Sequence, residues 1–214
     1  MKKVLLTICL ALLLKAVIAQ EELPGKELSH YVFPAFVDGT VKKKSGEIVK
    51  ASLNYNTITE EMIFDQAGQK LALDKLEDID TVYIQDKKFV PFEKVFYEVA
   101  ANTPVALFIQ HKSEIIPPGN NTGFGTSNTS AITNLTDFKT SGSAYKLQLP
   151  EDFKIRSKTA FWLRKNNNYA LIKTEKNVED LFPDKADAIK KFVKTNKINF
   201  KNPDDLIKLT VFCN

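Results

Sequence analysis

Short apolar runs separated by turn residues recur between residues 32 and 112, at intervals of about 8–12 residues. In several runs every second residue is apolar, as in Val95, Tyr97 and Val99, and this alternation is typical of strands with one buried face. Intervals this short leave no room for crossover helices, so neighbouring strands must run antiparallel. The pattern predicts strands at residues 35–42, 51–55, 61–64, 70–73, 81–85, 88–92, 95–100 and 105–112.

A long polar segment rich in Pro, Gly, Asn and Ser follows at residues 117–143. Loops of this length inside a domain are uncommon and are usually functional or disordered. Two interpretations stay open: a mobile hairpin insertion, and a lid or binding loop in which Phe124 and Asn128 contact a ligand. Strands are predicted again at residues 145–149, 159–165 and 169–174, with a turn at the three asparagines 166–168.

The apolar period changes to three or four residues near position 176, which indicates helices. Asn177 is the predicted N-cap of a first short helix, and Pro183 separates it from a longer helix over residues 184–195. Asn202 and Pro203 have the residue types that cap and begin a further helix. The polar side of this segment is rich in lysine; it is interpreted as a solvated face, with a surface for anionic polymers or lipid headgroups as the alternative.

Together these patterns predict a fold that is mainly β with C-terminal α. An antiparallel β-sandwich or barrel of about ten strands, with the long polar loop, occupies residues 32–175. A short helical segment, residues 176–214, packs on this β-rich domain.

The N-terminal 19 residues have the features of a secretory signal peptide. Lys2 and Lys3 precede an apolar run over residues 4–14, and small or modest side chains lead to a cleavage site between Ala19 and Gln20. This run is too short to span a bilayer, which takes about 20 residues. We therefore expect an extracytoplasmic protein, in the periplasm, on the outer-membrane surface or secreted, with no transmembrane segment in the mature chain. Residues 20–31 are interpreted as a flexible leader.

Charge and cysteine content narrow the possible partners. The chain has 30 Lys and Arg against 26 Asp and Glu, but Lys2, Lys3 and Lys15 lie in the signal peptide. Removal of these three leaves a net charge of +1, so composition gives no reason to expect nucleic acid as a partner. Cys9 also lies in the signal peptide, and Cys213 is then alone, which rules out an intrachain disulfide. Cys213 is interpreted as a small hydrophobic residue on a terminal helix.

The sequence contains few residues that could perform catalysis. Its two histidines are His30, in the leader, and His111, which has Glu114 three residues later in a strand or loop rather than on a helix, so no metal site is predicted. A serine nucleophile would depend on His111, and no Gly-x-Ser-x-Gly elbow, phosphate loop or dinucleotide fingerprint is present. We therefore assign no catalytic residue and expect no cofactor. Trp162 is interpreted as a buried residue of its strand. The alternative is that its side chain faces outward and contacts a ligand.

Segments 51–56, 60–64, 78–84, 181–185 and 197–200, together with the Ala19–Gln20 junction, resemble uncharacterised secreted proteins of Bacteroidota-type bacteria. This resemblance implies an extracytoplasmic location and lends no activity and no catalytic residue.

The function expected from the sequence is an extracytoplasmic binding or structural module rather than an enzyme. Its expected partners are an envelope glycan, a lipid or another envelope protein, and its candidate ligand-binding residues are Phe124, Asn128, His111 and Trp162. One alternative is a hydrolase of cell-envelope or other polysaccharides that uses paired carboxylates. A second alternative is an outer-membrane-associated protein.

Overall fold

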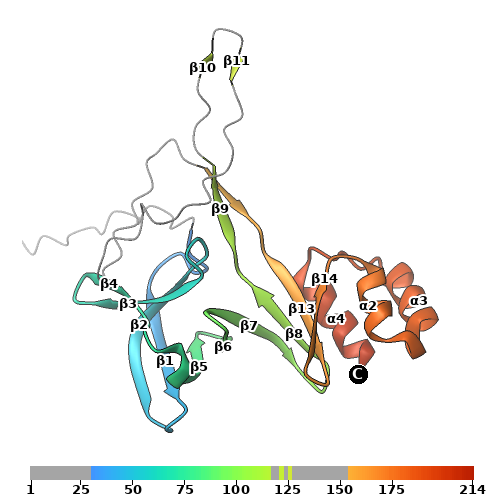
Figure 1. Cartoon of the computed structure of the whole chain (residues 1–214), viewed down its shortest axis with the longest axis horizontal. Coiled ribbons are helices and arrows are strands. Elements are labelled where there is room, and N and C mark those ends of the chain that lie inside the picture. Colours follow the sequence, from blue (N-terminus) through green and yellow to red (C-terminus); the bar gives the residue numbers. More distant parts are fainter. Residues whose placement is uncertain (1–29, 117–120, 123–124, 127–153) are drawn as a thin grey trace, which may run out of the picture.

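The structure, a computed structural model, describes residues 30–116, 121–122, 125–126 and 154–214, and its main feature is one antiparallel sheet of ten strands (Figure 1). From edge to edge the strands are β14 (Asn168–Ile172), β13 (Ala160–Lys165), β8 (Ala106–Gln110), β7 (Val95–Asn102), β6 (Lys87–Phe92), β5 (Ile79–Ile84), β1 (Val37–Lys43), β2 (Ile48–Asn56), β3 (Glu61–Gln66) and β4 (Gln69–Ala72). Helices α2 (Glu175–Leu181), α3 (Ala186–Asn196) and α4 (Pro203–Cys213) follow the sheet. The predicted fold class is confirmed. Edge strands β14 and β4 do not pair with each other, so the sheet is open and sandwich-like rather than a closed barrel.

Each strand predicted within residues 35–112 and 159–174 has a counterpart in this sheet. The turns also lie where the turn residues stand. Ala67 and Gly68 have φ of 54° and 84° between β3 and β4, and Asn166 and Asn167 have φ of 49° and 64° between β13 and β14. These left-handed conformations suit Gly and Asn, and they reverse the chain within two residues.

Strands β1–β6 form what we call the curled half, in which the sheet bends around its own apolar face (Figure 1). Tyr55 on β2 reaches across this bend and donates a hydrogen bond of 3.1 Å from its hydroxyl to the carbonyl oxygen of Phe96 on β7. Gly39 on β1 allows the close packing, because a Cβ at this position would lie 2.7 Å from the carbonyl oxygen of Tyr83. Buried apolar side chains fill the interior of the curled half: Leu53, Tyr55, Met62, Val82, Ile84, Phe89 and Phe96.

The segment before β1 is held across the curled half by Asn54, whose side chain is fully buried. The Asn54 Oδ1 atom accepts a hydrogen bond of 3.1 Å from the Phe33 amide, and its Nδ2 donates to the carbonyl oxygens of Phe33 and Ala35 at 2.9 and 3.0 Å. His30, at the end of the predicted leader, is 7% exposed, and its carbonyl oxygen accepts bonds from the amide and the hydroxyl of Thr57.

Strands β7, β8, β13 and β14 carry the helices on one face. α2 packs on β14, and α4 packs on β7 and β8. The apolar core of this part joins both layers and includes Leu107, Leu163, Ile172, Val178, Ile189, Leu206 and Cys213. The predicted packing of Cys213 on a terminal helix is confirmed: it is 2% exposed, and burial raises the pKa of its thiol to about 11, so the thiol stays protonated and unreactive.

The helix ends confirm one predicted cap and correct another. Asn202 caps α4, since its Oδ1 accepts a bond of 2.9 Å from the Asp204 amide and Pro203 begins the helix. The predicted N-cap at Asn177 is wrong, because α2 begins earlier and its N-cap is Thr174. Asn177 instead occupies the third helical position and accepts a bond of 3.1 Å from the Thr174 amide, as the partner residue of a capping box does.

Strands β9 (Ser113–Ile116) and β12 (Lys154–Ser157), which the sequence analysis missed, pair with each other as an arm that continues β8 and β13 (Figure 1). Within the predicted loop 117–143, β10 (Asn121–Thr122) pairs with β11 (Gly125–Thr126). The rest of that loop and the predicted strand 145–149 lie outside the described residues. In the part of the chain that the structure describes, no helix has both the length and the apolar character needed to cross a membrane.

Candidate functional site

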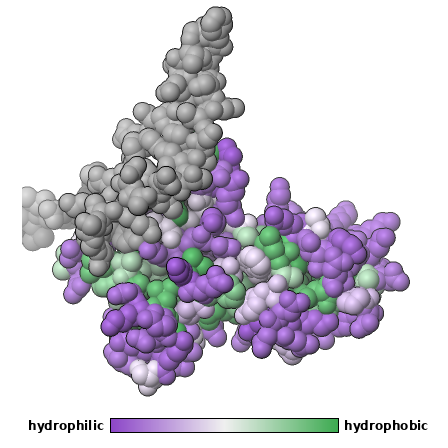
Figure 2. All heavy atoms as spheres, in the orientation of Figure 1, coloured by the Kyte–Doolittle hydropathy of each residue, from purple (hydrophilic) through white to green (hydrophobic). Residues whose placement is uncertain are grey.

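A groove with a volume of about 1140 Å³ lies between the curled half and the helices. Its lining includes Lys87 of β6, Glu98 of β7 and His111, which directly follows β8. Phe200, which precedes α4, and Ile207, on α4, also line it. In the view of Figure 2, hydrophobic residues gather across the middle of the described part, and hydrophilic residues cover the helices at the right. The apolar part of the groove lining belongs mainly to the core that the sheet shares with the helices, and includes Ile109, Phe161 and Ile172.

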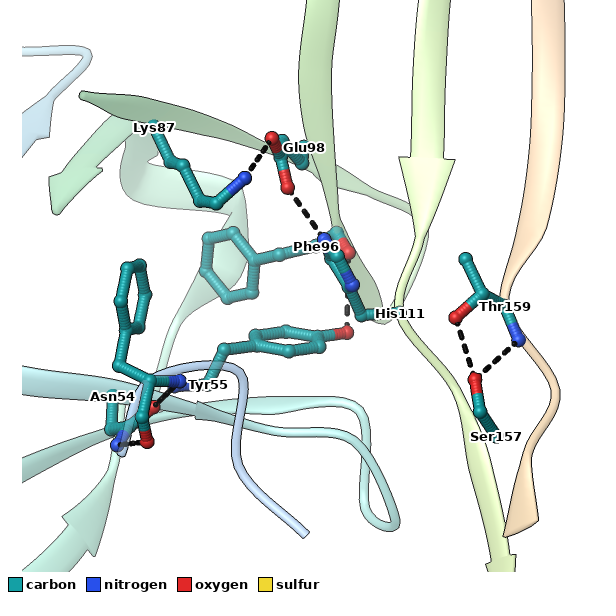
Figure 3. A network of polar contacts seen from close by, with 9 residues as sticks. Asn54, Tyr55, Lys87, Phe96, Glu98, His111, Ser157 and Thr159 are labelled. Carbon is teal, nitrogen blue, oxygen red and sulfur yellow. Dashed lines mark hydrogen bonds and ion pairs between the residues drawn. The ribbon is translucent and has the colours of Figure 1, made fainter. Parts of the chain in front are cut away.

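Glu98 is the central polar residue of the groove (Figure 3). Its side chain, which is 8% exposed, accepts a hydrogen bond of 2.6 Å from Lys87 Nζ at one oxygen and contacts His111 Nε2 at 2.5 Å with the other. Burial alone would raise the pKa of Glu98, but the bonds from His111 and Lys87 outweigh burial and hold the pKa below its usual value. Glu98 is therefore a buried, ionised carboxylate with a partner at each oxygen.

The position of His111 is fixed by aromatic side chains of the curled half. Its ring centroid lies 6.3 Å from that of Tyr55 and 6.2 Å from that of Phe89, and the Tyr55 and Phe89 rings stack on each other at 5.7 Å. Burial and nearby carboxylates raise the pKa of Tyr55 far above its usual range, so its hydroxyl remains a neutral donor to Phe96. His111 thus presents Nε2 to Glu98 while its ring packs against those of Tyr55 and Phe89.

The base of the arm is joined to the curled half by residues on both sides of His111, between the end of β8 and the start of β9. Gln110 Nε2 donates to Glu60 Oε1 at 2.6 Å, and Lys112 Nζ lies 3.1 Å from the other oxygen of Glu60. The Ser113 amide then donates to the carbonyl oxygen of Thr57 at 2.8 Å. These contacts set the direction of the arm and, with it, the position of the groove beside it.

Two hydroxyl groups lie in the same groove as the Glu98–His111 pair. Ser157 Oγ and Thr159 Oγ1 are 2.9 Å apart and hydrogen-bond to each other, as Figure 3 shows. Among the described residues, the hydrogen bond of the His111 side chain goes to Glu98 and none joins His111 to either hydroxyl. The arrangement is a pair of polar clusters that can bind a ligand, without the nucleophile-to-base bond of a catalytic triad.

The four candidate ligand-binding residues have different positions. His111 lines the groove and takes part in its central network. Trp162 is also among the residues that line the groove; its half-buried side chain stacks with Tyr97 and donates its indole N–H to Gln110 Oε1 at 3.2 Å. Phe124 and Asn128 lie outside the described residues.

The sequence analysis missed Glu98 and Lys87 as site residues. A signal for Glu98 was present, because it is the one charged residue in the apolar run 95–101 and stands at an inward position between Phe96 and Ala100. Lys87 had no such signal, since a lysine beside a hairpin turn is ordinarily solvated. Within the described residues, no group of three or more His, Cys, Asp or Glu side chains could hold a metal ion.

Comparison of the chain with protein-family models, curated proteins and solved structures found no match.

Proposed function

We propose that this protein is an extracytoplasmic binding module that takes its ligand into the groove between the curled half and the helices. The observation that supports this proposal most is the Lys87–Glu98–His111 network on one side of a groove of about 1140 Å³. Ligand sites are typically large concave surfaces with a few fixed polar groups, and buried polar groups are costly unless they are fully bonded. Here the polar groups are bonded and positioned before any ligand arrives.

The lining favours an envelope glycan among the expected partners. The groove lining combines the hydroxyl residues Ser157 and Thr159, the apolar residues Phe200 and Ile207, and charged residues such as Lys158. A lipid chain needs walls that are apolar throughout, whereas a glycan offers both hydroxyls and apolar ring faces. A mixed lining suits the second kind of ligand better.

The extracytoplasmic location rests on the N-terminal sequence and on the resemblance to secreted bacterial proteins. Sequencing the N-terminus of the protein recovered from the cell envelope or medium tests it, with Gln20 as the expected first residue. Recovery of the chain from the cytoplasm with Met1 or Lys2 at its start would contradict this location.

The hydrolase alternative requires one carboxyl group with a raised pKa to protonate the leaving group. Asp86, Glu98 and Asp204 line the groove, and Glu98 has the opposite property, since His111 and Lys87 keep it ionised. Glu98 is therefore suited to holding neighbouring side chains in place, and we favour binding over hydrolysis.

A thermal-shift screen tests the proposed function. The purified protein is heated with peptidoglycan fragments and other envelope glycans, with lipids, haem and divalent metals as further probes. A ligand at a hundred times its Kd should raise Tm by about 5–10 °C. The variant Thr159→Trp, which places a large ring in the groove, should lose the shift, and Gln66→Trp, at an exposed position outside the groove, should keep it. A glycan shift that Thr159→Trp leaves intact would place the ligand elsewhere and contradict the proposal.

A further inference from the structure

The inner face of β2 becomes less buried toward the hairpin that joins β2 to β1 (Figure 1). Alternate residues of a strand share a face. On this face Tyr55 and Leu53 are fully buried, Ala51 is half-buried and Val49 is 38% exposed. Val41 of β1 lies opposite Val49 and is 5% exposed. The interior of the curled half therefore opens to solvent at its hairpin end.

The sizes of the side chains explain this opening. At the closed end, the rings of Tyr55 and Phe89 stack on each other at 5.7 Å and occupy the interior. At the hairpin end, β1 and β2 present the smaller side chains of Val41, Val49 and Ala51. Protein interiors are close-packed when their side chains fill the space between the elements, and these three do not fill it.

The connection from β4 to β5 closes the other side of the opening. β4 pairs with β3 whereas β5 pairs with β1, so residues 73–78 must pass back across β3, β2 and β1. The two leucines of this connection pack against the core of the curled half, which places the connection on the inner side. Both of its ends are held, because the Leu73 amide donates to the Met62 carbonyl oxygen and the Lys44 amide to the Asp78 carbonyl oxygen, each at 2.8 Å.

A pocket with a volume of about 440 Å³ remains between this connection and the strands. We call it the hairpin-end pocket. Six of its ten lining residues are apolar: Val41, Val49, Ala51, Phe64, Leu73 and Ile79. The other four are charged: Lys43, Asp74, Lys75 and Asp78. Two lysines and two aspartates give no net charge, and three of these four residues are exposed. The pocket thus combines mainly apolar walls with a charged rim of both signs.

We propose that the hairpin-end pocket binds the acyl chain of a free fatty acid. Apolar walls that face water cost stability, and an acyl chain covers them without needing hydrogen bonds. A glycan would leave hydroxyl groups unpaired against the same walls. The volume is near the lower end of the range for small-molecule sites, about 300–1000 Å³, which suits one chain better than the two of a bilayer lipid.

The rim and the position of the pocket complete the proposal. Because the rim has no net charge, it leaves the headgroup in water, and the chain supplies the affinity. The lining of the hairpin-end pocket shares no residue with that of the groove. It is therefore a second binding site, independent of the proposed function.

Isothermal titration calorimetry of the full chain with octanoic, decanoic and dodecanoic acid tests the proposal. Each methylene group that leaves water should tighten Kd about fourfold, so Kd should fall about fifteenfold from one acid to the next until the chain fills the pocket. Dodecyltrimethylammonium, which has a cationic headgroup, should bind within about tenfold of dodecanoic acid, because exposed charges on the rim contribute little.

Two consecutive residues of β2 provide matched variants. Val49 lines the pocket, whereas Ile48, which is 62% exposed, points to the opposite face of the strand. Val49→Trp places a large ring in the pocket and should abolish binding of dodecanoic acid, and Ile48→Trp should bind it like the wild type. Thr159→Trp, in the groove, should also leave this binding unchanged. Circular dichroism of each variant checks that the fold is retained, and the series of acids tests the wild type without any substitution.

Several outcomes would overturn the proposal. One is a Kd that does not depend on chain length, or no binding of any of the acids. Another is an equal loss in Val49→Trp and Ile48→Trp, or a loss in Thr159→Trp, which would place the chain elsewhere. Sedimentation of the protein with phosphatidylcholine vesicles that Val49→Trp abolishes would assign the pocket to a membrane lipid. A dimer in sedimentation velocity that Val49→Trp abolishes, without binding of the acids, would assign it to a second copy of the chain.

Discussion

Replacement of Glu98 by glutamine removes the charge at the centre of the groove while keeping the size of the side chain. The Glu98 side chain is 8% exposed, and its partners His111 and Lys87 are 18% and 33% exposed. Removal of one partner from a buried ion pair costs about 3–5 kcal/mol. Because Lys87 reaches solvent and the amide oxygen still accepts one bond, we expect Glu98→Gln to lower the free energy of unfolding at pH 7 by about 2–3 kcal/mol.

The stability that Glu98 contributes should depend on pH. The pKa of Glu98 is lower in the folded protein than in the unfolded chain, where it is about 4.3. The ionised carboxylate therefore stabilises the fold above about pH 4.3, and this contribution is lost as the pH falls through the folded pKa. The difference in stability between wild type and Glu98→Gln should be largest near neutral pH and should shrink in acid.

Urea denaturation followed by the fluorescence of Trp162, the only tryptophan of the chain, measures both effects. The matched control is Glu47→Gln, which breaks the exposed pair of Glu47 with Lys43 and should cost less than about 0.5 kcal/mol. Equal losses in the two variants would refute the idea that burial of Glu98 carries the effect. A Glu98→Gln deficit that is unchanged at about pH 3 would refute the assignment to an ionised carboxylate.

Three further predictions concern stability. Gly39→Ala should cost about 1–3 kcal/mol in urea denaturation, because the added Cβ would lie 2.7 Å from the Tyr83 carbonyl oxygen and the curled half must shift. Asn54→Ala should cost about 3 kcal/mol in the same assay, since it leaves buried backbone groups of the Phe33 segment without partners, and a loss below about 1 kcal/mol would contradict this. Burial lowers the pKa of His30 from 6.5 to about 4, so stability should rise by up to about 3 kcal/mol between pH 4 and pH 6.5, and His30→Phe should flatten that rise.

The strand pattern could be predicted because short apolar runs are separated by turn residues, even where a strand such as β8 is buried on both faces. Val95, Tyr97 and Val99 alternate with Phe96 and Glu98 along β7, so the period of two is visible in the sequence. The arm could not be predicted in this way. β12 has the sequence Lys-Ile-Arg-Ser, with Ile155 as its single apolar residue. Among the described strands it pairs with β9 alone, and it lies outside the two large cores.

The groove depends on contacts between residues that are far apart in the chain, and no local period encodes such contacts. Tyr55 meets Phe96 across 41 positions, and Asn54 holds Phe33 across 21, yet both contacts determine how tightly the sheet curls beside the groove. Loop composition favours a site in residues 117–143, whereas the polar centre of the groove lies at Glu98, a charged residue inside an apolar strand. Burying a carboxylate costs free energy, so a strand keeps one at an inward position only where partners are available to neutralise it. An isolated charge that breaks an alternating apolar pattern is therefore a stronger sequence signal for a site in a β-sheet than the length of a polar loop.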